Sequence, residues 1–141
     1  MIEEIRKENN LIALIIKNTY KENGIKFFTP NEFSQQLAYM NRPKGYVILP
    51  HIHNLVKREV YFTKEVLYIK SGKVRVDFYE DNKCYLKSFV VSTGDVILLA
   101  SGGHGFTMLE NSEIIEIKQG PFVGEHDKTR FEQVSINKIK F

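Results

Sequence analysis

Short apolar runs alternate with turn-forming clusters along the chain, and the clearest alternation covers residues 73–78. In this stretch, Lys-Val-Arg-Val-Asp-Phe, every second side chain is apolar, so the three apolar side chains lie on one face of an extended strand. The polar cluster at 80–83 predicts a turn, and residues 85–91 predict the strand that pairs with the first one. The pattern therefore predicts a β-hairpin over residues 73–91.

Similar runs recur over the rest of the chain. Gly94 and Asp95 predict another turn, and the apolar run at 96–99 suits a short buried strand. Further strands are expected at 11–17, 25–29, 36–40, 46–49, 106–109 and 113–119. Residues 2–8 suit one or two helical turns, and periodicity alone does not separate the run at 11–16 from a buried helix. These elements predict an all-β sandwich or barrel with an N-terminal extension of strands and a short helix.

Size and composition limit the class of protein. With 141 residues, 43% hydrophobic and 26% charged, the chain suits one soluble domain with one core. No run reaches the roughly 20 apolar residues of a membrane span, and the charged N-terminus does not resemble a secretory signal, so we expect a cytoplasmic protein. Cys84 is the only cysteine, which excludes an internal disulfide and a thiolate-rich zinc site.

The net charge of +3 is spread along the chain. Duplex nucleic acid is normally bound by an arm or stripe of basic residues, and the sequence has neither, so we expect no nucleic-acid partner. A mildly basic surface favours an anionic metabolite, such as a phosphorylated or nucleotide-linked sugar.

The pair His51 and His53 is the first candidate for chemistry. On an extended strand, residues two positions apart project from the same face about 6–7 Å apart, so both imidazoles can reach one ion. Three of the four histidines and a glutamate occur in segments that a β-sandwich could bring together. Imidazole and carboxylate ligands suit Fe, Mn, Ni, Co or Zn. The pattern therefore indicates a site for one divalent transition metal.

The residues around this pair resemble the motifs of the cupin superfamily. Gly45, five residues, His51-Ile52-His53, and then Glu65, six residues and Gly72 resemble the first motif, written G-x5-H-x-H-x3/4-E-x6-G. Gly94, five residues and Ala100-Ser101-Gly102-Gly103-His104 resemble the second, written G-x5-P-x-G-x2-H-x3-N. The resemblance implies a cupin double-stranded β-helix, the jelly-roll β-sandwich or barrel. It implies one domain over residues 1–141, with an N-terminal extension at 1–44, the cupin core at 45–119 and a C-terminal segment at 120–141.

Carried over position by position, the resemblance implies that the metal ligands are His51, His53, Glu65 and His104. The chain departs from the family pattern in two places. Eleven residues separate His53 from Glu65 where three or four are usual, so an inserted loop at 54–64 is expected at the mouth of the site, and Glu59 is a competing ligand. The second motif lacks its proline and has Met108 where asparagine is usual. A metal-free cupin whose histidines line a pocket is the alternative.

The C-terminal residues 118–122 and 127–131 resemble small cupins encoded with polysaccharide or nucleotide-sugar genes. The resemblance favours a metal-dependent sugar or nucleotide-sugar isomerase or epimerase. For that mechanism we nominate Glu116 as the base and Lys118 or Arg58 as the cation that neutralises the substrate's charge; Glu116 and Lys118 share a strand face with Ile114. The same ligand set also resembles non-haem iron dioxygenases, and a non-catalytic module that binds a small ligand is a third hypothesis. Small cupins usually bury a sheet edge in a homodimer, so we expect a dimer.

Overall fold

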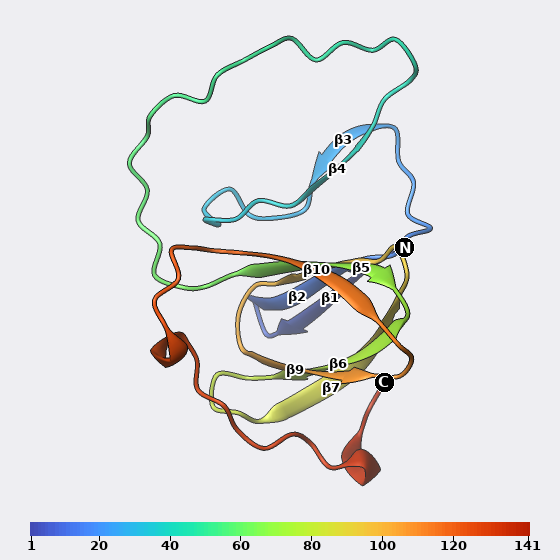
Figure 1. Cartoon of the computed structure of the whole chain (residues 1–141), viewed down its shortest axis with the longest axis vertical. Coiled ribbons are helices and arrows are strands. Elements are labelled where there is room, and N and C mark those ends of the chain that lie inside the picture. Colours follow the sequence, from blue (N-terminus) through green and yellow to red (C-terminus); the bar gives the residue numbers. More distant parts are fainter. The chain divides into compact units, whose positions relative to one another are not determined.

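A computed structural model describes residues 1–141, and its strands form antiparallel sheets of an all-β fold. The chain divides into two compact units, one made of Met1–Tyr20 and Thr63–Phe141 and the other of Lys21–Phe62 (Figure 1). No helix in it is long and apolar enough to cross a membrane. The expectation of a single cupin domain over 1–141 stays a prediction.

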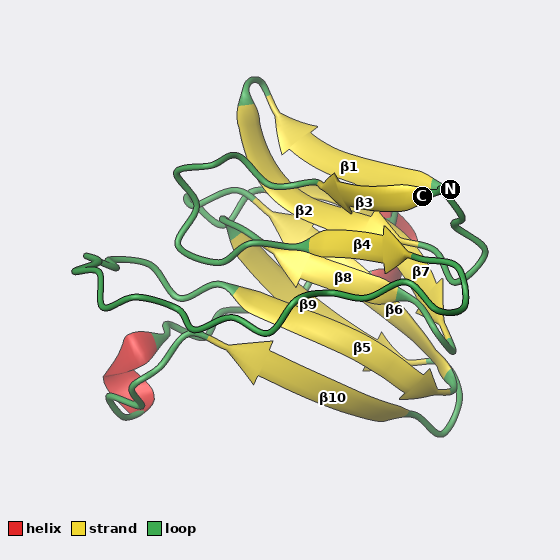
Figure 2. Cartoon of the chain, turned by 90° about the horizontal axis from the view of Figure 1, so that it is seen from above, coloured by secondary structure: helices red, strands yellow, loops and turns green.

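The first unit contains two sheets. Figure 2 shows the strands of the five-stranded sheet side by side in the order β1-β2-β8-β5-β10. Its strands are β1 (Ile2–Lys7), β2 (Asn10–Ile16), β8 (Val96–Leu99), β5 (Glu65–Ser71) and β10 (Glu113–Lys118). The three-stranded sheet has the order β7-β6-β9, with β6 (Lys73–Tyr79), β7 (Tyr85–Ser92) and β9 (Gly103–Met108). Single turns of 3-10 helix follow at Glu125–Asp127 and Ile136–Lys138.

The core lies between these sheets, which makes the unit a β-sandwich. The alternating side chains Val74, Val76 and Phe78 of β6 are fully buried and face residues of the five-stranded sheet. The opposite members of the core include Ala13, Ile15, Leu67, Ile69, Ile97 and Leu99. Strand β2 is buried at six of its seven positions, which explains its continuous apolar run. The predicted hairpin over 73–91 is confirmed as β6 and β7, with Val76 opposite Phe89.

The outer face of the three-stranded sheet carries a buried ion pair. Arg75 donates to both carboxylate oxygens of Asp77 at 2.9 and 3.1 Å and also to the hydroxyl of Thr107 at 3.0 Å. Ser88 donates a further hydrogen bond to Asp77 at 2.5 Å. Only 10% of the Arg75 side chain and 2% of the Asp77 side chain are exposed. The pair is therefore almost fully removed from water, although an outer face of a sheet is usually solvated.

The C-terminal segment covers this outer face. The backbone carbonyl of Lys140 accepts a hydrogen bond from the amide of Ser88, and its amide donates to the Tyr85 hydroxyl at 2.9 Å. Closer to the cavity described below, the amide of Val134 donates to the Tyr79 hydroxyl at 2.9 Å. These contacts attach the end of the chain to β6 and β7, and they explain why polar side chains of this sheet are buried.

The second unit contains one hairpin, formed by β3 (Gly24–Phe27) and β4 (Ala38–Asn41). Its connection is closed by a hydrogen bond of 2.7 Å from the Thr29 hydroxyl to the Gln36 side chain. Residues 42–62 follow without a strand, so the strand expected at 46–49 is absent. The strand geometry used to place His51 and His53 on one face is also not found.

The expected helical turns at residues 2–8 are wrong, because residues 2–7 form the edge strand β1. The sequence Ile-Glu-Glu-Ile has apolar residues three positions apart, which imitates a helix. A register shift between Ile5 and Arg6 interrupts the pairing of β1 with β2, and Ile5 is buried in the core. Tertiary pairing therefore decides the conformation of this segment. The strand expected at 106–109 is found, but it begins earlier, at Gly103.

Candidate functional site

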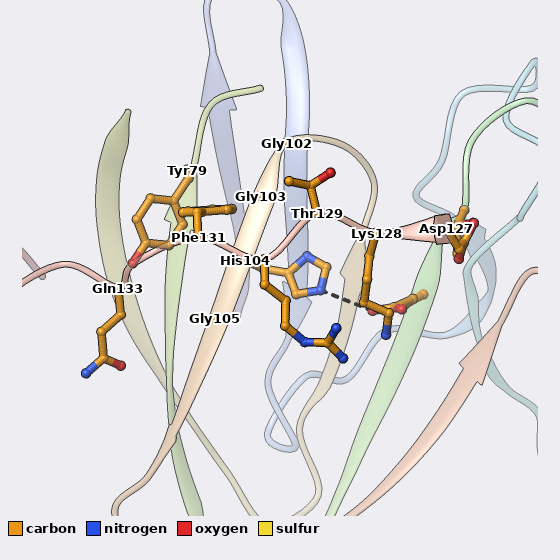
Figure 3. Close-up of a pocket in the computed structure, with 13 residues that line it drawn as sticks. Tyr79, Gly102, Gly103, His104, Gly105, Asp127, Lys128, Thr129, Phe131 and Gln133 are labelled. Carbon is orange, nitrogen blue, oxygen red and sulfur yellow. Dashed lines mark hydrogen bonds and ion pairs between the residues drawn. The ribbon is translucent and has the colours of Figure 1, made fainter. Parts of the chain in front are cut away.

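A cavity of about 470 Å³ opens in the sandwich unit next to the start of β5 and β9. Figure 3 shows residues from strands and from the C-terminal segment around it. The strands and the turn before β9 contribute Glu65, Tyr79, Gly102, Gly103, His104 and Gly105. Residues outside the strands contribute Thr63, Asp127, Lys128, Thr129, Arg130, Phe131 and Gln133. The cavity is large enough for a small metabolite.

His104 and Glu65 form an ion-pair contact in this cavity, with Nε2 of the imidazole 3.2 Å from a carboxylate oxygen (Figure 3). The two residues come from strands of different sheets, β9 and β5. The exposed fraction of the side chain is 29% for His104 and 16% for Glu65, so water and small molecules can still reach both residues. Two of the four predicted metal ligands therefore lie side by side, although 38 residues separate them in the chain.

Glycines set the path of the backbone that carries His104. Gly102 has φ of +68°, in the left-handed region, and a side chain there would overlap with the carbonyl oxygen of Tyr79. At Gly103, a Cβ atom would lie 2.8 Å from the ring of Phe131. The two glycines therefore let β9 begin close to β6 and to the C-terminal segment. This placement brings His104 to the cavity wall.

The pKa of Glu65 is lowered from its ordinary value. The largest cause is the hydrogen bond from His104, and the positive charges of His104, Lys118 and Lys128 act in the same direction. Burial of the carboxyl acts against them and raises the pKa, but by less. Glu65 is therefore a carboxylate at neutral pH, ready to accept a hydrogen bond or to bind a cation.

The stabilisation provided by Glu65 should depend on pH. A glutamate whose pKa is lower in the folded state stabilises that state fully above its unfolded pKa, about 4.3, and this contribution disappears as pH falls through the folded value. We expect Glu65→Gln to lower the melting temperature at pH 7, with a difference from wild type that shrinks below pH 4. Thermal unfolding followed by circular dichroism measures this. Glu132→Gln, in the exposed C-terminal segment, is the control, and a difference for Glu65→Gln that is unchanged between pH 7 and pH 3 would contradict the assignment.

The other two predicted ligands lie in the second unit. The ring centroids of His51 and His53 are 5.2 Å apart, so the imidazoles are neighbours even though no strand holds them. Nδ1 of His51 is 3.0 Å from the carbonyl oxygen of Leu49. Neither unit by itself assembles three or more His, Cys, Asp or Glu side chains into a group that could hold a metal ion. The four predicted metal ligands thus form two pairs: Glu65 with His104 in the first unit, and His51 with His53 in the second.

The predicted catalytic residues Glu116 and Lys118 lie on β10. They share a face with Ile114, which packs against the core, and Lys118 is opposite Glu65 in the strand register. The Lys118 ammonium is 3.9 Å from the Glu116 carboxylate, whose side chain is half exposed. Neither residue lines the cavity, but the charge of Lys118 reaches Glu65. Their catalytic roles stay predictions.

The C-terminal wall of the cavity was not found as a functional element from the sequence. In the sequence, residues 127–131 are notable only through their resemblance to small cupins. They have neither strand nor helix periodicity, and they come together with β5 and β9 only through the tertiary fold. The run of alternating charges Asp127, Lys128 and Arg130 was the available indication.

No family model, curated protein or solved structure matches this chain. Its function is therefore inferred from its own residues.

Proposed function

We propose that this chain is a cupin enzyme that isomerises or epimerises a small anionic sugar or nucleotide sugar. The observation that carries the proposal is the contact between His104 and Glu65 in the wall of a cavity that is also lined by cationic side chains. The order of the cupin-like motifs and the β-sandwich support the same family. A homodimer accompanies the proposal, and β1 and β10 are the edge strands of the larger sheet that a partner could cover.

The proposal includes one divalent transition metal bound by His51, His53, Glu65 and His104. The donor set fits such an ion, because imidazoles and an ionised carboxylate are ligands of Fe, Mn, Ni, Co and Zn, and the lowered pKa keeps Glu65 charged at neutral pH. When bound, the metal supplies a Lewis acid that stabilises the negative charge formed when an α-proton is removed from a hydroxy-carbonyl substrate.

The chain's own residues supply the proton transfer. In an isomerisation, a base removes the proton next to a carbonyl and a proton is returned to the neighbouring carbon. In an epimerisation, it is returned to the same carbon on the opposite face. Glu116 is the base predicted from the sequence, and Lys118 is predicted to offset the negative charge of the substrate. The carbon skeleton is unchanged, so no oxidant is needed.

The contact between His104 and Glu65 favours a second candidate, proton transfer by His104 without a metal. Nε2 of His104 contacts Glu65 at 3.2 Å, so in the neutral imidazole that acts as a base the proton is on Nε2 and Nδ1 accepts the proton of the substrate. The carboxylate of Glu65 then stabilises the imidazolium that forms. In this candidate His104 is the base, and Glu65 orients it.

Metal content separates the two candidates. We expect the purified wild-type protein to contain about one equivalent of metal by mass spectrometry, because four ligands form one site. Replacing His51, His53, Glu65 or His104 by alanine is expected to reduce that content at least tenfold. His126→Ala is the matched control, since His126 is an exposed histidine of a 3-10 turn. A chelated, metal-free protein that keeps full activity would overturn the metal-dependent proposal and support proton transfer by His104 alone.

A further inference from the structure

Two cationic side chains of the C-terminal segment line the cavity, Lys128 and Arg130. Figure 3 labels Lys128 among the residues around it. The Lys128 ammonium is within ion-pair distance of no carboxylate, although its charge contributes to the lowered pKa of Glu65 and of Glu125. Arg130 uses Nη1 in an ion pair of 2.7 Å with Glu125, and its Nε and Nη2 donate no hydrogen bond to the protein. The cavity therefore presents an ammonium and part of a guanidinium group whose donors are available to a ligand.

The fold holds these cations in place through contacts on both sides of them. Before them, the Thr63 hydroxyl donates to the carboxylate of Asp127 at 3.1 Å. After them, the ring of Phe131 packs edge-on against Tyr79 with a centroid distance of 5.0 Å, and the amide of Val134 donates to the Tyr79 hydroxyl. The segment that carries Lys128 and Arg130 is thus attached to the sandwich at both ends, although it contains no strand.

Each carboxylate near the cavity has a polar contact within the protein, and the contact of Asp127 is with a hydroxyl, which leaves its charge in place. Glu65 contacts His104, and Asp127 accepts a hydrogen bond from Thr63. Glu125 pairs with Arg130, but both side chains are 73% exposed, and such surface pairs are weak and easily exchanged. An oxyanion that binds at Lys128 and Arg130 can therefore replace Glu125 without leaving a buried carboxylate unpaired.

We propose that Lys128 and Arg130 form the subsite that binds an oxyanion group of the substrate, a phosphate or a carboxylate. The guanidinium offers planar donors that match two oxygens of such a group, and the ammonium adds a point charge. The identity of the group as part of a substrate rests on the proposed function. The subsite itself does not depend on catalysis or on a metal.

The test is calorimetric titration of the full chain with inorganic pyrophosphate in a buffer that contains a metal chelator. Saturable binding by the wild type is expected, and Lys128→Ala and Arg130→Ala should each weaken it about tenfold or more, as expected for a charge-assisted hydrogen bond. Lys138→Ala removes the same charge from an exposed 3-10 turn of the same segment and should leave the affinity unchanged. Titration with glucuronate in a parallel experiment shows whether the subsite prefers phosphate or carboxylate.

Absence of saturable binding of both anions to the wild type would overturn the subsite, and so would equal affinities of the wild type and the Lys128→Ala/Arg130→Ala double variant. Lys128 and Arg130 are both exposed and lie outside the strands, so we expect these variants to fold. Circular dichroism of each variant checks this. The experiments distinguish a failure of the proposed isomerase or epimerase function from a failure of the oxyanion subsite. Normal pyrophosphate binding without any isomerase or epimerase activity rejects the proposed function alone, whereas turnover with wild-type KM in the double variant rejects the subsite alone.

Discussion

Replacing Asp77 by alanine is expected to lower the free energy of unfolding by about 3–5 kcal/mol, the range found when one partner of a buried ion pair is removed. The variant leaves the guanidinium of Arg75 without the carboxylate that accepts two of its hydrogen bonds. It also removes the acceptor of the Ser88 hydroxyl, which is completely buried. Urea unfolding followed by circular dichroism measures the loss.

Two further variants test whether the loss of stability in Asp77→Ala comes from the buried ion pair or would follow the removal of any charged side chain. Glu113→Ala breaks an exposed pair with Lys70, and because surface pairs contribute little to stability, its effect should be far smaller than that of Asp77→Ala. The double variant Arg75→Met/Asp77→Leu removes both charges and should be clearly more stable than Asp77→Ala, because no buried charge is left without a partner. If Asp77→Ala were as stable as Glu113→Ala, the ion pair would not be buried in solution and the C-terminal segment would not cover it.

Replacing His104 by glutamine is expected to lower kcat by about 10²- to 10⁴-fold, the usual contribution of a group that transfers a proton in the transition state. In both candidate mechanisms His104 contacts the reacting centre, as a metal ligand or as the base. The glutamine amide can still donate to Glu65, so the variant keeps the shape and the hydrogen bond of the site. The measurement is exchange of solvent deuterium into the α position of candidate sugars, followed by nuclear magnetic resonance.

Glu116→Gln is the companion experiment, because Glu116 is the base predicted from the sequence. Loss of exchange with unchanged metal content would support that prediction, and unaltered exchange would remove Glu116 from the mechanism. Exchange by His104→Gln within twofold of the wild type would reject both candidate mechanisms. Retained pyrophosphate binding by His104→Gln would show that a loss of activity comes from the missing imidazole, as metal ligand or as base, and not from a misfolded cavity.

Local alternation was enough to predict the framework of the sandwich. The hairpin over 73–91 follows from apolar residues at every second position, and its inner side chains are buried as expected. Alternation also suggests that the polar side chains on the other face of β6 are solvated, and for two of them this is not the case. Arg75 and Asp77 alternate with the core residues, yet both are buried, and the C-terminal segment, more than 50 residues later, bonds to Tyr85 and Ser88 of the neighbouring strand. No local pattern contains that information.

For the candidate site, too, the sequence predicted some of the residues and missed others. The spacing of the cupin-like motifs singled out Glu65 and His104, and the structure brings them into contact across two sheets. The rest of the cavity depends on long-range packing. Lys128 and Arg130 are placed by the contact of Phe131 with Tyr79, which the sequence does not encode as a motif. Sequence reasoning thus found residues with recognisable chemistry, and it missed those that act through their position.

One wall of the cavity consists of strand residues and the other of an irregular segment, so the two walls should tolerate substitution differently. Glu65 and His104 lie on strands, where most substitutions disturb a sheet. The opposite wall is an irregular stretch that is anchored by Asp127 and Phe131, so residues 128–130 can change without altering a strand pairing or an anchoring contact. Substitution of these three positions should therefore change which small molecules the cavity accepts while the contact between Glu65 and His104 is kept.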